Sequence, residues 1–475
     1  MRAAILSSEA VPFAKTGGLA DVAGALPKAL RKQSVDAIVV LPLHQQIDRK
    51  LLSKEIIENV RVEWRGKTRA IRVFQSEASG APAYLIEAPG YFSRASIYGF
   101  GDDHERFAFF CRAALALFKH LDWQPDIIQG NDWPCGFAMI ELRARRRYDK
   151  LFANTRTVFS IHNMAYQGAL DPNDLWWLGF GEQPDRNDFM FGNVASALKA
   201  GLVTGDALST VSRRYALEIQ TPELGHGLEW LARARRSSLV GITNGVDYDV
   251  WNPSTDPHIA KNFDSDDLNG KRKCKLDLLR RFGLPEDADR PIIATISRLV
   301  AQKGYDLIRQ AAGAILSTGA VFIALGAGAK EYEDFLQRWH DSAPQQIGIY
   351  KGYAGEPLAH QIEAGADMFL MPSLYEPCGL NQMYSMRYGT VPIVRATGGL
   401  DDTVENFNET RGTGNGFKFE AYSASALLEK IREALYFYGK PEAWRAIQEN
   451  GMSIDNSWDA AARRYVELYE QTGRS

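Results

Sequence analysis

The sequence predicts an α/β protein built from two doubly wound parallel sheets, one in each half of the chain. Three observations support this prediction. Short apolar runs typical of buried strands alternate with segments of helical periodicity. A polar, turn-rich stretch interrupts the alternation near the middle of the chain, after which the alternation starts again. The length of 475 residues exceeds what one ordinary core holds and suits two large domains.

The first half of the chain contains six runs typical of buried parallel strands, because apolar residues dominate them and turn signals bound them. Helical segments separate these runs. The first helical segment places Leu19, Val22 and Leu26 at the spacing of one helix face. The predicted strands are 3–8, 36–41, 126–129, 157–161, 207–211 and 239–242.

The second half repeats this pattern after a stretch that contains Pro253, Pro257 and several aspartates. Its predicted strands are 291–296, 321–325, 347–350, 367–371 and 391–394. We therefore expect two Rossmann-like domains, joined by a connector and followed by a C-terminal helix that packs back on the N-terminal domain. The expected boundaries are 1–245 for the N-terminal domain, 246–270 for the connector, 271–455 for the C-terminal domain and 456–475 for the helix.

Composition places the chain among ordinary globular enzymes, with 45% hydrophobic residues, 24% charged residues and a formal net charge of −3. That charge argues against a nucleic-acid binder, and the densest basic run, 143–147, is typical of a helix end. The four cysteines lie far apart and the histidines form no ligand pair, so no structural zinc is predicted. We find neither a signal peptide nor a long apolar segment, and we expect a cytoplasmic protein without membrane contact.

The most informative motif is the cationic glycine loop Lys15-Thr16-Gly17-Gly18-Leu19, between the first predicted strand and the first helix. Gly17 and Gly18 let backbone N–H groups approach an anion, the helix start adds partial positive charge, and Lys15 adds a full charge. Such a loop can bind a diphosphate. Taken alone, it is also compatible with a tight turn that carries a solvated lysine, and it matches neither the P-loop nor the dinucleotide fingerprint.

Further loops of this kind follow the predicted strands of the second half. The loop 297–304 carries Arg298 and Lys303, which could clamp a second face of a diphosphate. The segment 372–380 and the glycine loop 397–403 follow the next strands. Ligands of doubly wound sheets bind outside the carboxyl ends of the strands, so we expect the two domains to face each other across a deep cleft that encloses the substrate.

In order along the chain, these motifs resemble those of the bacterial glycogen synthase and plant starch synthase family, retaining glucosyltransferases of the two-lobed GT-B fold. The resemblance covers essentially the full length. The matching motifs are K-T-G-G-L at 15–19, A-D-V at 20–22, H-N-x-A-Y-Q-G at 162–168, L-K-A-G at 198–201, N-G-V-D at 244–247, S-R-L at 297–299, Q-K-G at 302–304, E-P-C-G-L at 376–380 and T-G-G-L at 397–400.

The resemblance implies transfer of glucose from ADP-glucose to the non-reducing end of an α-1,4-glucan such as glycogen, with retention of configuration and release of ADP. It implies no cofactor, and because cations already neutralise the diphosphate we expect no metal requirement. Three alternatives stay open. They are a related transferase that uses UDP-glucose, a two-lobed phosphorylase, which would need a cofactor lysine, and a catalytically silent glucan-binding homologue.

The resemblance also assigns roles to individual residues. Lys15, Arg298 and Lys303 would bind the diphosphate of the donor. The residues expected to carry the chemistry are Glu376, His162, Lys303, Arg298 and Asp132. Those expected to bind the donor, with Tyr353 stacked on the nucleobase, are Lys15, Gly17, Gly18, Asp21, Asn244, Tyr353, Cys378, Gly379, Leu380, Thr397, Gly398 and Gly399. Those expected to line the acceptor or sugar pocket are Tyr91, Arg94 and Asn163.

Elementary electrostatics supports the roles assigned to these cations. Negative charge grows on the leaving diphosphate as the glycosidic bond breaks, so Arg and Lys in a water-poor site stabilise the transition state more than the ground state. In this family the departing phosphate oxygen is thought to accept the proton of the attacking hydroxyl. We therefore assign no catalytic base.

The chain departs from the family pattern at three places. The segment 129–133 is Q-G-N-D-W where the family has H-x-H-D-W, so both histidines are lost. The broader superfamily often has a second glutamate eight residues after the first, where this chain has Tyr384, as the glycogen synthase branch commonly does. The segment 91–94 is Y-F-S-R where the family has Y-[FL]-D-R, so Arg94 lacks its neighbouring aspartate.

Several residues also have a structural interpretation. A buried, hydrogen-bonded histidine is the alternative role of His162. We expect Cys378 to pack in the interior rather than act as a nucleophile, and the pair 176–177, two tryptophans, to lie in the core rather than stack on a glucan. The D-x-D segments 247–249 and 264–266 match the metal-binding pattern of another glycosyltransferase fold, but both lie in the connector and are weak signals.

Overall fold

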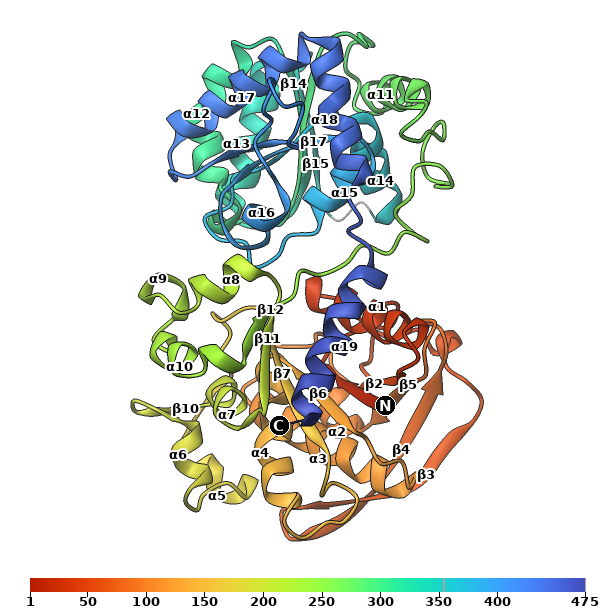
Figure 1. Cartoon of the computed structure of the whole chain (residues 1–475), viewed down its shortest axis with the longest axis vertical. Helices are drawn as coiled ribbons and strands as arrows, with labels where there is room; N and C mark the ends of the chain where they lie inside the picture. Colours follow the sequence, from red (N-terminus) through yellow and green to blue (C-terminus); the bar gives the residue numbers. More distant parts are fainter. Residues whose placement is uncertain (353–354, 475) are drawn as a thin grey trace. The chain divides into compact units, whose positions relative to one another are not determined.

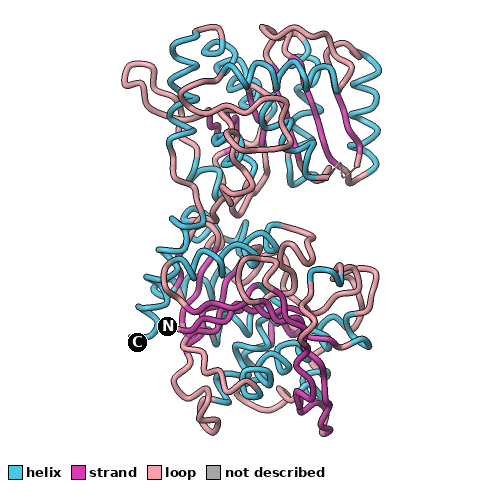
Figure 2. The backbone as a smooth tube through the Cα atoms, turned by 90° about the vertical axis from the view of Figure 1, so that its right-hand side faces the viewer, coloured by secondary structure: helices cyan, strands magenta, loops and turns pink. Residues whose placement is uncertain are grey.

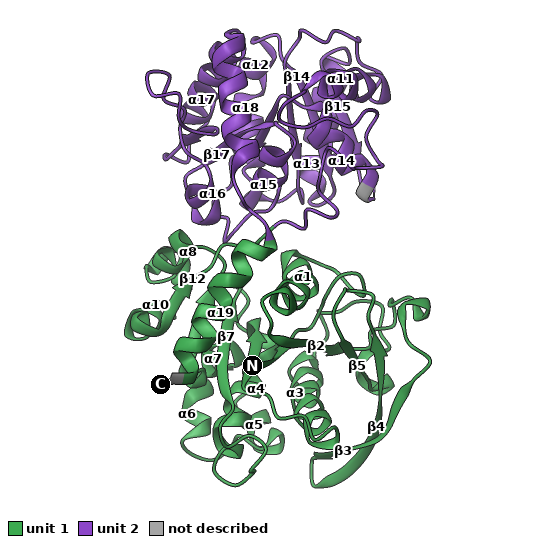
Figure 3. Ribbon diagram, turned by 45° about the vertical axis from the view of Figure 1, so that its right-hand side comes forward, with its two compact units in different colours: residues 1–245, 458–475 green, residues 246–457 purple. Residues whose placement is uncertain are grey.

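The computed structural model describes residues 1–352 and 355–474. The chain forms two compact units, coloured along the sequence in Figure 1 and by unit in Figure 3. Unit 1 contains residues 1–245 and the C-terminal segment from Trp458, and unit 2 contains Val246–Ser457. Each unit holds a parallel sheet with helices on its faces, so the predicted α/β fold class with two doubly wound sheets is confirmed.

Unit 1 is built on a nine-stranded sheet with the order β12-β11-β7-β6-β1-β2-β5-β4-β3. The strands from β12 to β5 run parallel, whereas β4 and β3 continue the sheet as an antiparallel hairpin at one edge, seen in Figure 2 as a projecting pair of strands. The strands are β1 (Arg2–Leu6), β2 (Asp36–Pro42), β3 (Ile56–Trp64), β4 (Lys67–Ser76), β5 (Ala83–Glu87), β6 (Ile127–Asn131), β7 (Arg156–Ile161), β11 (Ala207–Thr210) and β12 (Leu239–Gly241).

Helices cover both faces of this sheet, because each buries one apolar stripe against the strands. A small antiparallel sheet formed by β8 (Ala169–Leu170), β10 (Val194–Ser196) and β9 (Met190–Phe191) lies in the same unit. The helices of unit 1 are α1 (Gly18–Lys32), α2 (Pro89–Phe92), α3 (Asp103–His120), α4 (Asp132–Arg145), α5 (Asp174–Leu178), α6 (Asp185–Phe189), α7 (Ala197–Thr204), α8 (Arg213–Glu218), α9 (Pro222–Gly225), α10 (Glu229–Ala234) and α19 (Trp458–Arg474).

The C-terminal helix α19 belongs to unit 1 although it follows unit 2 in the chain, and Figure 3 draws it in the colour of unit 1. It packs against α1 and β7. Trp458, Tyr465 and Tyr469 are buried along one side of it. These large side chains anchor the end of the chain on the sheet of unit 1.

Unit 2 contains a six-stranded parallel sheet with the order β15-β14-β13-β16-β17-β18. Numbered within the unit, this is the order 3-2-1-4-5-6 of dinucleotide-binding folds. Its strands are β13 (Ile292–Ile296), β14 (Val321–Gly326), β15 (Ile347–Lys351), β16 (Met368–Met371), β17 (Val391–Arg395) and β18 (Phe417–Phe419). Its helices are α11 (Asn269–Arg281), α12 (Tyr305–Leu316), α13 (Lys330–Ser342), α14 (Glu356–Gly365), α15 (Asn381–Arg387), α16 (Gly398–Thr403), α17 (Ala424–Tyr438) and α18 (Pro441–Ser453).

Both sheets have a switch point, where the strand order reverses and neighbouring loops leave toward opposite faces. In unit 1 it lies between β1 and β6, and in unit 2 between β13 and β16. In doubly wound folds, ligands bind at such points, outside the carboxyl ends of the strands. The sequence motifs singled out above follow β1, β6 and β7 in unit 1 and β13, β16 and β17 in unit 2.

The segment between β12 and α11 packs on unit 2 through its aromatic residues. The Trp251 indole is stacked between His360 and Tyr384, with ring centroids 3.8 Å and 3.9 Å away. Phe263 is buried against Tyr388 nearby. This stretch therefore has a fixed conformation on the domain that it precedes.

Among the described residues, no helix combines the length and the apolar character that crossing a bilayer requires.

Candidate active site

The predicted site residues lie at the carboxyl ends of the strands beside the two switch points. In unit 1, Lys15 follows β1, while Asp132 and His162 follow β6 and β7. In unit 2, the loop with Arg298 and Lys303 follows β13, Glu376 follows β16 and the glycine loop at 397–399 follows β17. Tyr353 lies outside the described residues. Each unit thus carries one cluster of candidate residues.

In the glycine loop of unit 1, the lysine and the backbone amides already have partners. The Lys15 ammonium pairs with Asp21 on α1, with 2.6 Å between Nζ and Oδ1. The buried Glu9 carboxylate accepts hydrogen bonds from the Thr16 amide and from the Thr16 hydroxyl, the latter at 2.7 Å. Burial raises the pKa of Glu9. Lys15 remains half-exposed and can turn toward a ligand at the cost of a weak surface ion pair.

Glu9 is a candidate residue that the sequence analysis missed. It directly follows the first predicted strand, 3–8, and a carboxylate so close to a glycine loop was the available signal. Because Glu9 holds the loop by its amides, it fixes the loop conformation that presents Lys15.

Asp132 connects the ends of β6 and β7. Its Oδ1 accepts a hydrogen bond from the His162 backbone N–H at 2.7 Å and a longer one from the Asn163 N–H at 3.4 Å. Asp132 also has a φ of +55°, in the left-handed region that non-glycine residues seldom adopt. Burial raises the pKa of its carboxyl to about 7. A buried, strained, proton-holding carboxyl of this kind is typical of functional sites.

The His162 side chain is held by a residue of the altered Q-G-N-D-W segment. Its Nε2 lies 3.0 Å from Oδ1 of Asn131, which is fully buried on β6. Burial lowers the pKa of His162 to about 4, so the imidazole is neutral near pH 7. Asn131 in turn contacts Gln129, and Gln129 contacts Tyr469 of α19. The two residues that replace the family histidines are therefore integrated into a hydrogen-bonded network beside His162.

Asn244 has an unused hydrogen-bonding atom. Its side chain is only 6% exposed, and Oδ1 is buried without a hydrogen-bond partner among the described residues. An unsatisfied buried amide oxygen is costly, and a ligand hydroxyl would satisfy it. By contrast, the Asn163 Oδ1 is already used, since it accepts a hydrogen bond from the Ala165 N–H at 3.0 Å.

Tyr91 and Arg94 have partners inside unit 1. The Tyr91 hydroxyl donates to Glu105 at 2.6 Å, and burial, together with this carboxylate, raises the pKa of Tyr91 to about 12. Arg94 forms a two-pronged ion pair with Asp102, both distances being 2.6 Å. Asp102 thus pairs with Arg94 in this chain, where the family motif has an aspartate directly before the arginine. The guanidinium is ordered without that neighbour.

In unit 2, the cation and the carboxylate of the two principal motifs form an ion pair. The Lys303 ammonium donates to Oε2 of Glu376, which also accepts a hydrogen bond from the Ser373 hydroxyl at 3.3 Å. Glu376 is only 7% exposed, whereas Arg298 on the same loop as Lys303 is solvent-exposed. A buried carboxylate at a strand end can accept hydrogen bonds from hydroxyl groups of a sugar, and two cations on one loop can bind an anion.

The two glycine-containing segments of unit 2 pack directly on each other. A Cβ atom on Gly398 would lie 1.9 Å from the Glu376 carbonyl oxygen, and one on Gly399 would lie 2.1 Å from that of Cys378. Gly398 also has a φ of +46°, which disfavours any side chain. The two glycines of the T-G-G-L motif therefore allow its backbone to pack directly against the E-P-C-G-L segment.

The structure also tests the expectations for the tryptophan pair, Cys378 and the D-x-D segments. The prediction that the tryptophan pair lies in the core is wrong for Trp176, which is 60% exposed because the short helix α5 lies at the surface. Cys378 is buried, as expected. In the D-x-D segments, Asp247 and Asp264 accept hydrogen bonds from backbone amides two residues on, which is a turn role. The described part of the chain contains no cluster of three or more groups suited to a metal ion.

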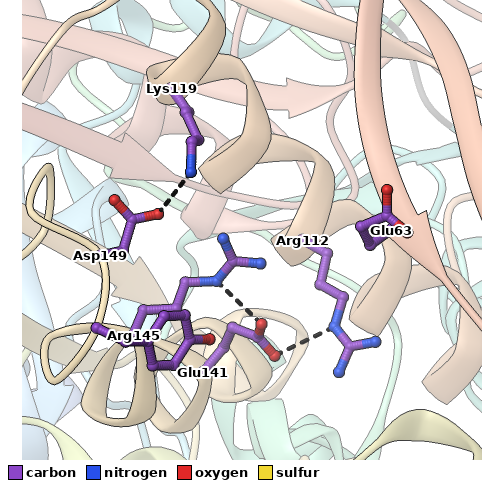
Figure 4. A pocket seen from close by; sticks show the side chains of 7 residues that line it. Glu63, Arg112, Lys119, Glu141, Arg145 and Asp149 are labelled. Carbon is purple, nitrogen blue, oxygen red and sulfur yellow. Dashed lines mark hydrogen bonds and ion pairs between the residues drawn. The ribbon is translucent and has the colours of Figure 1, made fainter.

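A pocket of about 430 Å³ lies elsewhere on unit 1, between α3, α4 and β3 (Figure 4). Glu141 lies between Arg112 and Arg145, with distances of 3.1 Å and 3.0 Å, and Lys119 pairs with Asp149 at 3.1 Å. Together with Glu63, which also lines the pocket, these two carboxylates balance the three cations, so the pocket has no excess positive charge for an anion.

Comparison with known proteins identifies the family. Residues 2–234 match the starch synthase catalytic domain, and residues 279–451 match the glycosyl transferases group 1 domain. A glycogen synthase of Koribacter versatilis is 44% identical over 99% of this chain and 98% of its own length. Glycogen synthase 1 of Geobacter sulfurreducens is 43% identical over 98% of this chain and 94% of its own length. The chain belongs to the glycogen and starch synthase family.

Solved structures agree with this membership. The catalytic domain of starch synthase IV from Arabidopsis thaliana, bound to ADP and acarbose, matches with a TM-score of 0.91 and 33% identity, covering 100% of this chain and 99% of that domain. Sucrose-phosphate synthase from Thermosynechococcus elongatus matches with a TM-score of 0.64 at 16% identity and supports the GT-B fold alone. The chain is a glucosyltransferase of the glycogen synthase type.

Proposed function

We propose that this enzyme transfers glucose from ADP-glucose to the non-reducing end of an α-1,4-glucan, with retention of configuration and release of ADP. The observation that carries the proposal is the ion pair between Lys303, which follows β13, and the buried Glu376, which follows β16; the exposed Arg298 lies on the same loop as Lys303. Further support comes from the starch synthase IV domain, which matches the whole chain and was solved with ADP and acarbose.

In unit 2, Glu376 would bind the sugar of the donor and Lys303 its diphosphate. On donor binding, Glu376 accepts hydrogen bonds from glucose hydroxyls, while Lys303 and Arg298 bind the diphosphate. The amides of Cys378, Gly379 and Leu380 complete the sugar contacts. As the glycosidic bond breaks, the two cations stabilise the charge on departing ADP, and each such hydrogen bond contributes about 1.5 to 3 kcal/mol.

In unit 1, Lys15 contributes a third cation to the diphosphate and His162 binds a hydroxyl of the transferred glucose. Asp132 and Asn244 orient the sugar and the acceptor hydroxyl, with Asn244 using its unpartnered oxygen. No side chain is needed as a base, because the departing phosphate oxygen takes the proton of the attacking hydroxyl. The contribution of the enzyme is then positioning and electrostatic stabilisation.

The alternative of a catalytically silent glucan-binding protein is less well supported. It drew on the lost histidines at positions 129 and 131, but the residues at these positions are hydrogen-bonded to each other and Asn131 contacts His162. Binding of a neutral polymer also gives no reason for cations at the ends of β1 and β13.

The test is incorporation of labelled glucose into glycogen from ADP-glucose or UDP-glucose, in the presence of excess chelator, with released nucleoside diphosphate measured in parallel. We expect incorporation from ADP-glucose, one ADP per glucose, at a rate at least about tenfold above that from UDP-glucose. Faster incorporation from UDP-glucose would show that UDP-glucose, not ADP-glucose, is the donor. Loss of activity in chelator that Mg²⁺ restores would refute the metal-free mechanism. No incorporation from either donor would support the silent homologue.

A further inference from the structure

The network beside His162 begins at a group that can act only as an acceptor. The backbone carbonyl of Leu6, on β1, accepts a hydrogen bond from the Asn131 side chain at 2.9 Å. A carbonyl oxygen has no proton to give, so the atom of Asn131 that faces Leu6 must be the Nδ2 amide. The other atom of this side chain, Oδ1, therefore faces His162 and Gln129.

This orientation fixes every donor along the network. Oδ1 of Asn131 is an acceptor, so the His162 Nε2, 3.0 Å away, must carry a proton. The Gln129 amide donates to the same oxygen at 3.3 Å. The Gln129 Oε1 is then left to accept, and the Tyr469 hydroxyl donates to it at 2.5 Å. Reversing either amide would place two acceptors against each other.

We propose that Asn131, Gln129 and Tyr469 are positioning residues that hold His162 in its Nε2-protonated form, so that Nδ1 is an acceptor for a hydroxyl of the bound sugar. The ring is neutral near pH 7, so Nδ1 keeps its lone pair. Nδ1 has no hydrogen-bond partner in the described part of the chain. The identity of the sugar rests on the proposed function, whereas the hydrogen-bond network does not.

The network also gives α19 a role in the site. Tyr469 is fully buried, and its hydroxyl joins a C-terminal helix to a residue 340 positions earlier in the chain. Gln129 spans the distance between Tyr469 and Asn131 because its side chain offers a donor and an acceptor together. The glutamine and asparagine that replace the two family histidines thus supply a fixed direction of hydrogen bonding.

The first readout is the protonation of His162 by ¹⁵N NMR of histidine-labelled enzyme, with the signals assigned by their loss in His162→Gln. We expect a pyrrole-like Nε2 and a pyridine-like Nδ1 in the wild-type enzyme. Asn131→Leu should give averaged shifts for both nitrogens and lower kcat/KM for ADP-glucose about tenfold. Asn131→His, which can donate to Leu6 and accept from His162, should keep the wild-type tautomer and rescue kcat/KM.

The second readout uses a matched pair on α19. Tyr469→Phe removes the hydroxyl that donates to Gln129 and should lower kcat/KM about threefold. Tyr465→Phe removes a hydroxyl one turn earlier on the same helix and should leave kcat/KM and the His162 shifts at wild-type values. Equal effects of the two variants would remove Tyr469 from the proposal.

The outcomes separate this inference from the proposed function. A proton on Nδ1 in the wild-type enzyme, or an unchanged tautomer in Asn131→Leu, would overturn the inference even if the enzyme uses ADP-glucose. A wild-type enzyme that shows the expected tautomer but transfers no glucose would refute the proposed function and establish the network.

Discussion

At the scale of single residues, the site is defined by ionisable groups whose surroundings change their usual behaviour. Burial keeps a proton on Asp132 to about pH 7 and keeps His162 uncharged down to about pH 4. Glu376 instead stays beside a cation, Lys303. At pH 7 the imidazole of His162 in unit 1 is therefore a neutral hydrogen-bonding group, whereas Glu376 in unit 2 is part of an ion pair.

The raised pKa of Asp132 predicts a dependence of stability on pH. The unfolded carboxyl loses its proton near pH 4, whereas the folded one keeps it to about pH 7, so the folded state loses stability as the pH rises between these values. Asp132→Asn cannot titrate and should weaken this decline. The measurement is the melting temperature of both proteins from pH 4 to pH 8. Parallel curves would show that Asp132 ionises normally in the folded protein.

The ion pair in unit 2 predicts a loss of rate without a loss of fold. Glu376→Gln keeps the size of the side chain but removes the charge beside Lys303, so transfer from ADP-glucose should slow about 10- to 100-fold. Glu420→Gln, at an exposed position of the same unit, is the control and should keep the wild-type rate. Circular dichroism checks the fold. A Glu376→Gln rate within about twofold of wild type would remove Glu376 from the sugar site.

At the scale of elements, the sequence pattern predicts most of the buried parallel strands but misses β5, β18 and the edge hairpin of β3 and β4. The strands around β1 and β13 are continuous apolar runs, because helices cover both of their faces. In β3 and β4 charged residues alternate with apolar ones and one face is exposed, so neither strand has that signal. Likewise, no local pattern shows that Trp176 lies on a short surface helix.

The stack on α15 explains one departure from the broader superfamily. Tyr384 occupies the position where a second glutamate often occurs, and its ring lies 3.9 Å from the Trp251 indole. Tyr384→Phe should keep this ring contact. Tyr384→Glu should lose the stack, lower stability by about 2 to 4 kcal/mol and gain no transfer activity. Thermal unfolding and the glucose-transfer assay test both variants, and a faster Tyr384→Glu enzyme would contradict this explanation.

At the scale of the whole molecule, the order of the motifs along the chain was the strongest indication of the site. Each motif follows a strand, and doubly wound sheets bind ligands at the carboxyl ends of their strands. The sequence therefore predicts which residues gather at the strand ends. It does not predict the contacts that hold them, since those join distant segments. The contacts of Leu6 with Asn131 and of Tyr469 with Gln129 are set by the packing of β1, β6 and α19.

The central claim is that the enzyme extends α-1,4-glucans at their non-reducing ends. The most direct test is to label glycogen with glucose from ADP-glucose and digest the product with β-amylase, which cleaves maltose from the non-reducing ends of α-1,4-linked chains. We expect the label to be released as maltose, because each glucose is added with retained configuration at that end. Label that resists β-amylase, or no labelled polymer at all, would contradict it.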